Sequence, residues 1–486
     1  MTEVVLGRPL GILDVEAIAF LHATPVLGDA ARERIAAGRA VVDRAVASRV
    51  PAYGINTGVG SQKDFAVEPA EIEAYNTRLI AAHATDATGP AASPAQVRAA
   101  LTVQLQLFAT GRPGVRPAVV DALLARLVAD DLPTARRGSS VGASDIVAMS
   151  QLSAPIVARH EGISGGHGPA PVASLAAKEA LALLNNNSFT LGAGALVVAE
   201  AARLLAMWDQ VAALTLEGFR GNAGAWSAPV DAARGQPGQS RVGMRLRAAL
   251  AGSALLEHGA ARLLQDPLCI RCVPQIHGAA DAALAFCWDA WERELNAVPD
   301  NPLTYWEEDR FISHGNMEST LLALSLDALR LGIAKVADAA NERVHKVQWP
   351  GFSGLPPGLA HASGVVGGVQ FLNLGHIAAA SAAAIHVHAT PAVLAFRGQV
   401  CDGVEDVGGS APLAVEAAER LLERAWVLMA VEAVCACYGI ERRDLDPAAL
   451  GEVTGPLFAT IRPLLPIGRE GDVVFRLAPV IEALKR

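Results

Sequence analysis

Apolar side chains recur every three or four positions along most of the chain, and this spacing predicts amphipathic helices. Three stretches carry the pattern over about twice the mean helix length; they cover residues 194–219, 317–344 and 412–440. Alanine and leucine, the best helix formers, are frequent in them, and strand-like alternation is hard to find. We therefore expect an all-α fold built on a bundle of long helices, each with more than one buried face.

The length and the interruptions between helices suggest two regions. A chain of 486 residues exceeds the usual size of a single domain. We expect an N-terminal helical region over 1–195 and a central long-helix bundle with C-terminal helices over 196–486. Glycine-rich and polar segments separate the helices, and such loops on a rigid scaffold commonly carry function; they include "PAYGINTGVGSQKD", "RRGSSVGAS", "NNNSF", "QDPLCIRCVPQIHG", "VPDNPLTYWEEDRF" and "GQVCDGVEDVGG".

Charge and composition favour a small-molecule partner. The net charge is −9 and no block of five or six like charges occurs, so we expect neither nucleic acid nor a membrane surface as partner. The start of the chain lacks a basic leader with an apolar core, and no run of 18 uncharged apolar residues follows. We expect a soluble, cytoplasmic protein. Six cysteines are too few for a disulfide framework, and "CIRC" lacks a second pair at zinc spacing, so we expect no metal.

Several polar residues stand in unusual surroundings. Tyr53 lies in the glycine-rich "AYGINTGVG", where a tyrosine beside cations or hydrogen-bond donors can act as a general base; a structural tyrosine bonded to a turn also explains it. His83 follows a helical run and also suits a core position. Arg271 lies in an uncharged stretch, where a guanidinium needs a carboxylate from the protein or from a substrate.

Other loop residues have a structural and a functional interpretation as well. Asn185, in "NNNS", either caps a helix or directs its amide at a ligand. Glu405 belongs to an acidic pair in a glycine-rich loop, which is either a solvated turn or a ligand contact. Lys63 follows the tyrosine loop and is either a surface lysine or a cation that acts on Tyr53 or on a carboxylate. Apolar long helices further suggest that some surface is buried against other subunits.

The order of these motifs resembles that of the histidine and aromatic amino-acid ammonia-lyase family. The resemblance runs in register over nearly the whole chain, through "YGINTGVG", His83, "SSVGAS", "KEALALLN", "QDPLCIRC", "DNPL", "GN" and "ED". It implies an all-helical, fumarase/aspartase-like homotetramer built round long central helices, with active sites shared between subunits. Family members remove an amine from the α-carbon and a proton from the β-carbon, which gives an α,β-unsaturated acid.

The resemblance also assigns roles to individual residues. Tyr53 corresponds to the catalytic tyrosine and Arg271 to the residue that holds the substrate carboxylate. Asn185 corresponds to a residue beside the family's electrophile. His83 lies where histidine- and tyrosine-specific members have a histidine, and Glu405 where histidine-specific members have a glutamate near the imidazole. Together these correspondences favour a substrate that carries an imidazole ring.

One segment departs from the family pattern at the electrophile itself. Members read "GSVGASGDLAPL", and their Ala-Ser-Gly closes into a methylidene-imidazolone (MIO) ring. This chain has Ala143, Ser144 and Asp145, and the β-carbon of Asp145 restricts a backbone that glycine would leave free to compress. Leu268 and Met317 also replace aromatic residues that surround the ring in the family. We expect that the ring does not form and that no other cofactor is needed.

Without the ring, the substrate must bring its own leaving group. A trimethylammonium group departs as a neutral amine, and a negative charge at Asp145 would attract it. We therefore expect a carbon–nitrogen lyase of the ergothionase type, which releases trimethylamine from a histidine-derived betaine. In it Tyr53 takes the β-proton and Arg271, with Lys63 as a second candidate, binds the carboxylate. The alternatives are an MIO-dependent ammonia-lyase, an aminomutase and a non-catalytic binding or scaffold protein.

Overall fold

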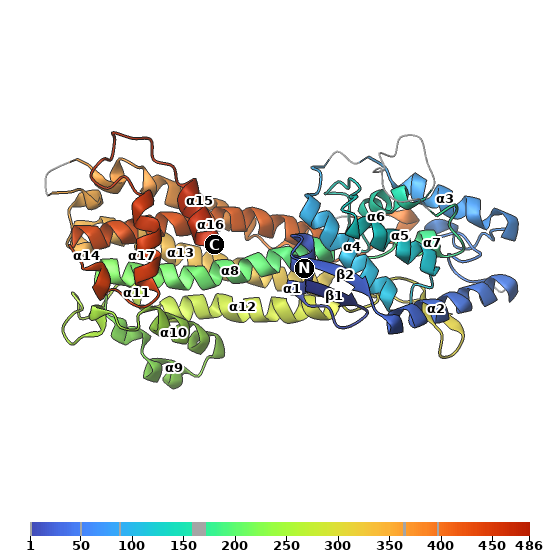
Figure 1. Ribbon diagram of the computed structural model, residues 1–486, viewed down its shortest axis with the longest axis horizontal. Coiled ribbons are helices and arrows are strands. Elements are labelled where there is room, and N and C mark those ends of the chain that lie inside the picture. Colours follow the sequence, from blue (N-terminus) through green and yellow to red (C-terminus); the bar gives the residue numbers. More distant parts are fainter. Residues whose placement is uncertain (1, 49–50, 87–88, 158–171, 363–365, 396–397) are drawn as a thin grey trace. The chain divides into compact units, whose positions relative to one another are not determined.

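The computed structural model describes residues 2–48, 51–86, 89–157, 172–362, 366–395 and 398–486 (Figure 1). The chain forms two compact units, and each is assembled from three segments. The first unit contains Met1–Ala199, Cys287–Leu326 and Pro391–Glu416, and the second contains Glu200–Phe286, Asp327–Thr390 and Ala417–Arg486. The first unit thus holds the expected N-terminal region 1–195 together with two segments from later in the chain.

Four long helices contribute residues to both units. They are α8 (Ser188–Phe219), α12 (Val273–Glu294), α13 (Thr320–Gln348) and α16 (Ala411–Arg442). Three of them confirm the helices predicted from apolar spacing. The fourth corrects the interpretation of "QDPLCIRCVPQIHG" as a loop, because α12 begins within it at Val273. Pro274 in its first turn and Gly278 in its second obscure the helical pattern in the sequence.

Buried polar contacts join the long helices inside the second unit. The Trp208 indole on α8 and the Arg343 guanidinium on α13 both contact the Glu432 carboxylate on α16. His277 on α12 contacts Asp209 on α8 at 2.8 Å. The shorter helices of this unit are α9 (Ala228–Arg234), α10 (Pro237–Ala249), α11 (Leu268–Arg271), α14 (Pro350–Ser353), α15 (Leu374–His388), α17 (Thr454–Ile461) and α18 (Ala478–Lys485).

The first unit packs shorter helices around α4, which is buried along nearly its whole length. These helices are α1 (Ile12–Ala19), α2 (Asp29–Ser48), α3 (Ile72–His83), α4 (Pro94–Ala109), α5 (Pro117–Val128), α6 (Ile146–Ser153) and α7 (Glu179–Leu184). Helix α1 and helix α5 pack on α4, while α3 and α6 both pack on α7. Helix α7 therefore sits among elements that carry the candidate site residues.

Within the described part of the chain, the fold also contains four short strands, which the all-α expectation did not include. Strands β1 (Thr2–Leu6) and β2 (Ala23–Leu27) pair in parallel, and β3 (Leu303–Tyr305) and β4 (Arg310–Ile312) pair antiparallel. Each has three to five residues, too few for an alternating pattern to stand out in the sequence. Both sheets are minor additions to a helical protein.

One helical stretch among the described residues is long and apolar enough to cross a membrane. It covers Glu179–Phe219, and 72% of its most apolar window is buried inside the protein. A core helix of a folded domain meets the same criterion of length and hydropathy. Its burial here agrees with a place in the protein core.

Candidate active site

The loop with Ala143, Ser144 and Asp145 is held by three consecutive asparagines. The Ser144 hydroxyl donates to Asn185 Oδ1 at 2.7 Å, and its backbone N–H donates to Asn187 Oδ1 at 2.9 Å. The Asp145 N–H donates to the carbonyl oxygen of Asn186 at 2.8 Å. The backbone of Ser144 has φ +69°, and its side chain is buried. The "NNNS" segment therefore holds this loop rather than capping a helix alone.

The carboxylate of Asp145 points at the first turn of α8. The two oxygens accept hydrogen bonds from the N–H and the hydroxyl of Thr190, both at 2.7 Å. The side chain is buried, so desolvation raises its pKa while the Thr190 donors oppose that rise. A carboxylate at a helix N-terminus also stabilises the helix. Asp145 thus caps α8, and its expected place beside a departing amine stays a prediction.

Asn185 connects the Ser144 loop to the turn that precedes β3. Its Nδ2 donates to the carbonyl oxygen of Asn301 at 3.1 Å, while its Oδ1 accepts from Ser144. The same turn places Asp300 against Lys178, whose ammonium lies 2.6 Å from Asp300 Oδ2. Sequence reasoning did not assign Lys178 or Asp300, although both belong to the motifs "KEALALLN" and "DNPL" that support the resemblance.

Tyr53 lies on a loop with a tight hydrogen-bonded structure. Its phenolic oxygen accepts a hydrogen bond from the Gly60 N–H at 3.1 Å. Tyr75 on α3 lies close by; burial raises the pKa of its phenol, the neighbouring Tyr53 adds to the rise, and a backbone hydrogen bond from Val59 opposes it. Tyr53 also lines a cleft of about 490 Å³ with Pro302 and other residues of the β3–β4 region. The cleft has room for a small molecule next to the phenol.

Glu405 lies on a loop that contacts the tyrosine loop. Its backbone pairs with Val400, and the short helical turn Cys401–Gly403 packs on the turn Gly60–Gln62. Burial raises the pKa of the Cys401 thiol, and the negative charge of Glu405 raises it further. The structure therefore brings the loop of Glu405 to the loop of Tyr53, although the two loops lie far apart in the sequence.

Two other candidates have plain local surroundings. His83 is the last residue of α3, and its Nδ1 lies 2.8 Å from the Leu79 carbonyl oxygen; because a carbonyl oxygen only accepts, Nδ1 is the donor in this contact. Lys63 is half exposed and pairs with Asp64 at 3.5 Å. Its surroundings match the interpretation of Lys63 as a surface lysine. Its role toward Tyr53 or a substrate carboxylate stays a prediction.

Arg271 belongs to the second unit, where it ends α11. Its terminal guanidinium nitrogens contact the side-chain amide oxygen of Gln265. The Arg271 Nε is buried with no hydrogen-bond partner among the described residues. No carboxylate of the described residues forms an ion pair with Arg271. An arginine with a neutral partner retains its positive charge for a carboxylate from outside the chain.

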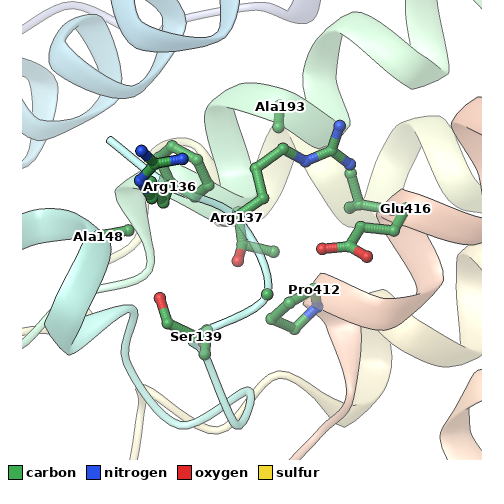
Figure 2. Close-up of a pocket in the computed structure, with 12 residues that line it drawn as sticks. Arg136, Arg137, Ser139, Ala148, Ala193, Pro412 and Glu416 are labelled. Atoms are coloured by element: carbon green, nitrogen blue, oxygen red, sulfur yellow. The ribbon is translucent and has the colours of Figure 1, made fainter. Parts of the chain in front are cut away.

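A small cavity lies behind the Ser144 loop, in the first unit. It is lined by Ser139, Ser140 and Thr190, and Figure 2 shows the Arg137 side chain extending toward Glu416 across it. Its volume of about 30 Å³ holds about one water molecule. A substrate does not fit there, so the larger cleft beside Tyr53 is the better candidate for binding.

The described residues contain no group of three histidine, cysteine or acidic side chains arranged to hold a metal ion. The cysteines of "CIRC" are free thiols, and Cys269 is buried with its pKa raised to about 11 by desolvation. A buried neutral thiol is a poor nucleophile and a poor ligand. The surroundings of Cys269 therefore give no sign of a catalytic or metal-binding role for this thiol.

Comparisons with known proteins agree over nearly the whole chain. The family model for aromatic amino acid lyases matches residues 10–463. A histidine ammonia-lyase from Anaeromyxobacter sp. (strain K) is 33% identical over 465 residues, which is 91% of each chain. A histidine ammonia-lyase from Symbiobacterium thermophilum is 32% identical over 497 residues, which covers 100% of this chain and 96% of the relative.

Solved structures share the same fold. The ergothioneine-degrading enzyme ergothionase from Treponema denticola matches with a TM-score of 0.91 and 25% identity, over 99% of this chain and 98% of that one. Histidine ammonia-lyase from Trypanosoma cruzi matches with a TM-score of 0.86 and 25% identity, over 100% and 92%. The chain therefore belongs to the aromatic amino acid lyase family and is a carbon–nitrogen lyase.

Proposed function

We propose that this protein eliminates trimethylamine from a histidine-derived betaine without an MIO ring. The observation that carries the proposal is the state of Asp145. Ring closure requires the Asp145 amide nitrogen to attack the carbonyl carbon of Ala143. That N–H instead donates to Asn186, and the Asp145 side chain is fixed on Thr190. These residues do not fit the ring, and no step of the reaction is assigned to it.

A quaternary amine removes the need for the ring. The C–H bond at the β-carbon breaks when the Tyr53 phenolate takes the proton, and its electron pair forms the new carbon–carbon double bond. The C–N bond at the α-carbon breaks as this double bond forms, and its electron pair stays on the nitrogen, which leaves as neutral trimethylamine. The Gly60 N–H donates a hydrogen bond to the phenolic oxygen, and Tyr53 lines the cleft. A general base must lie within reach of the proton that it takes.

Charge complementarity supports the rest of the substrate assignment. Arg271 has no carboxylate partner among the described residues and suits a substrate carboxylate. Glu405 lies on a loop that contacts the tyrosine loop and suits an imidazole N–H. Trimethylammonium has no N–H to donate, so Asp145 acts on it only through its negative charge. Ergothionase, which matches with a TM-score of 0.91, is described as an ergothioneine-degrading enzyme, and ergothioneine is a substrate of this class.

The proposal is tested by incubating the protein with ergothioneine, hercynine, histidine and tyrosine. We expect the two betaines to yield trimethylamine and a conjugated acid, followed by mass spectrometry of the amine and by ultraviolet absorbance. Tyr53→Phe serves as the inactive control. Turnover of free histidine with neither betaine consumed would contradict the substrate assignment and favour an ordinary ammonia-lyase.

That second function has its own support. The similar curated relatives are named histidine ammonia-lyase at 30–33% identity, and structures named aminomutase share the fold. An aminomutase would return the amine to the β-carbon, so analysis of the nitrogen-containing product separates it from a lyase. A non-catalytic binding protein would consume none of the four compounds.

We also propose that the protein is a homotetramer with shared active sites. On α13 the large apolar side chains of Leu321, Leu324 and Leu331 are each about half exposed, and their spacing of three and seven places them on one face of the helix. Such a face is normally buried against a partner. Light scattering after size-exclusion chromatography tests this, and a monomeric mass would contradict it.

A further inference from the structure

We propose that Lys178 and Asp300 are positioning residues for the elimination and act through Asn185. The proposal rests on the proposed function of the site. Both side chains are completely buried, and the Lys178 Nζ lies 2.6 Å from Asp300 Oδ2. A buried ion pair is seldom a net source of stability compared with apolar packing. Its presence next to the candidate site therefore calls for another explanation.

Helix α7 is attached at both ends to the same turn. Lys178 precedes its first residue and Asn185 follows its last. Lys178 reaches Asp300, and Asn185 Nδ2 donates to the carbonyl oxygen of Asn301. The seven steps from Lys178 to Asn185 rise by ~10 Å at helical spacing, whereas the Cα atoms of the neighbouring residues Asp300 and Asn301 are ~3.8 Å apart. The long Lys178 side chain reaches Asp300, and this contact closes a ring of contacts around α7.

The ring of contacts fixes the orientation of the Asn185 amide. Its Nδ2 faces the Asn301 carbonyl and its Oδ1 accepts from the Ser144 hydroxyl. An amide has its donor and its acceptor on opposite branches, so the contact with Asn301 decides which branch faces Ser144. If the turn moves, the amide loses the partner that orients it. The position of Asp300 and Asn301 thus determines what Asn185 presents to the site.

The turn itself depends on Lys178 and on His314. His314 Nε2 lies 2.9 Å from the Asp300 carbonyl oxygen, and the His314 backbone N–H donates to Asn301 Oδ1 at 2.9 Å. Asp300 Oδ1 is buried without a hydrogen-bond partner among the described residues. Burial raises the pKa of Asp300 to about 6, and Lys178 opposes this rise. Loss of the Lys178 ammonium would let the carboxyl take up a proton and lose its ionic attachment to α7.

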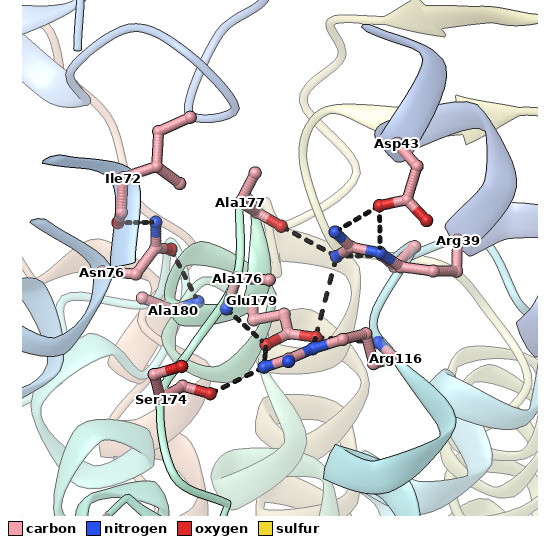
Figure 3. A network of polar contacts seen from close by, with 11 residues as sticks. Arg39, Asp43, Ile72, Asn76, Arg116, Ser174, Ala176, Ala177, Glu179 and Ala180 are labelled. Atoms are coloured by element: carbon pink, nitrogen blue, oxygen red, sulfur yellow. Dashed lines mark hydrogen bonds and ion pairs between the residues drawn. The ribbon is translucent and has the colours of Figure 1, made fainter. Parts of the chain in front are cut away.

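A separate network holds α7 in the fold, so the pair can be removed without unfolding the helix. Glu179 is buried beside Lys178 in sequence, and its carboxylate accepts from the Arg116 guanidinium at 2.7 Å and from the Ala176 N–H at 2.7 Å (Figure 3). Arg39 lies 3.6 Å from the same carboxylate. These contacts leave Lys178 and Asp300 untouched. We therefore expect Lys178→Met to fold, with a lowered melting temperature because Asp300 loses its buried partner.

A double-mutant cycle tests whether Lys178 acts through Asn185. We expect Lys178→Met to lower kcat on the betaine by about 100-fold, the loss that a misplacement of about 1 Å in an active site can cause, with KM unchanged. The double variant Lys178→Met/Asn185→Ala should be no slower than Asn185→Ala alone, since residues that act through one another are not additive. Arg343→Met is the control: it breaks a buried ion pair with Glu432 in the second unit, and its effect should multiply with that of Asn185→Ala.

A crystal structure of Lys178→Met supplies a readout that needs no turnover. We expect Asn185 to lose its contact with Asn301 or with Ser144. Retention of both contacts, or kcat effects of Lys178→Met and Asn185→Ala that multiply, would overturn the positioning role. A wild-type protein that consumes none of the four compounds would contradict the proposed function instead, and the crystal structure would still decide the effect of Lys178 on Asn185.

Discussion

The backbone N–H of Asp145 donates a hydrogen bond to the carbonyl oxygen of Asn186 across 2.8 Å. This bond joins the loop after Ser144 to the segment between α7 and α8. It occupies the one nitrogen that would have to attack the Ala143 carbonyl if the loop were to cyclise. The family's glycine is replaced by a residue whose amide and carboxylate both have partners in the fold. The chemistry of the site is therefore expected to depend on side chains alone.

Tyr53→Phe tests the general base. Removal of the hydroxyl leaves no group to take the β-proton, and general bases commonly contribute about 10²- to 10⁴-fold, so kcat on the betaine should fall by that factor. Tyr305→Phe is the matched control, because the Tyr305 ring contacts Arg112 through its face. Steady-state kinetics of both variants compare them. Equal loss in the two variants would contradict a chemical role for Tyr53.

Asp145→Gly tests the cap on α8. The substitution removes both hydrogen bonds to Thr190, and loss of a helix cap costs about 1–2 kcal/mol, so the free energy of unfolding should fall by about that amount. Asp145→Asn retains one acceptor and should cost less. Urea denaturation followed by circular dichroism measures both. An Asp145→Gly variant as stable as the wild type would show that the carboxylate is not a structural cap.

Glu179→Gln tests the network that anchors α7. The change removes the negative charge that two guanidinium groups contact inside the protein. Removing one partner of a buried pair typically costs 3–5 kcal/mol, so we expect a loss of about that size in the free energy of unfolding. Asp309→Asn, in an exposed pair with Arg44, should leave stability unchanged. Similar losses in the free energy of unfolding in both variants would mean that the buried Glu179 contacts stabilise the fold no more than the exposed Arg44–Asp309 pair.

The pH dependence of stability should reflect His314. Burial lowers its pKa below the ordinary value, and the neutral ring accepts from the Asn316 N–H at Nδ1. The unfolded state therefore binds the proton more readily, so the contribution of His314 to stability is present above about pH 6.5. It is lost as the pH falls through the lowered pKa. Melting temperatures from pH 8 to pH 5 should fall less steeply in His314→Gln, and identical slopes would contradict this.

The sequence supported the long helices better than the contacts between them. Apolar spacing located α8, α13 and α16, because a buried helix face repeats every three or four residues. Apolar spacing did not locate α12 or the four short strands. The Lys178–Asp300 pair joins residues 122 positions apart, and no local pattern encodes such a pairing. The available signal was the pair Lys178 and Glu179 inside the otherwise apolar "ASLAAKEALALL", since a buried lysine requires a partner.

The accurate intact mass of the purified protein tests the central claim most directly. Formation of the MIO ring from residues 143–145 would remove two molecules of water from the chain. We predict the unmodified mass, identical within error to that calculated from the sequence. The mass of Ser144→Ala should then differ from that of the wild type only by the lost oxygen atom. A wild-type mass lower by two waters, restored in Ser144→Ala, would contradict the account.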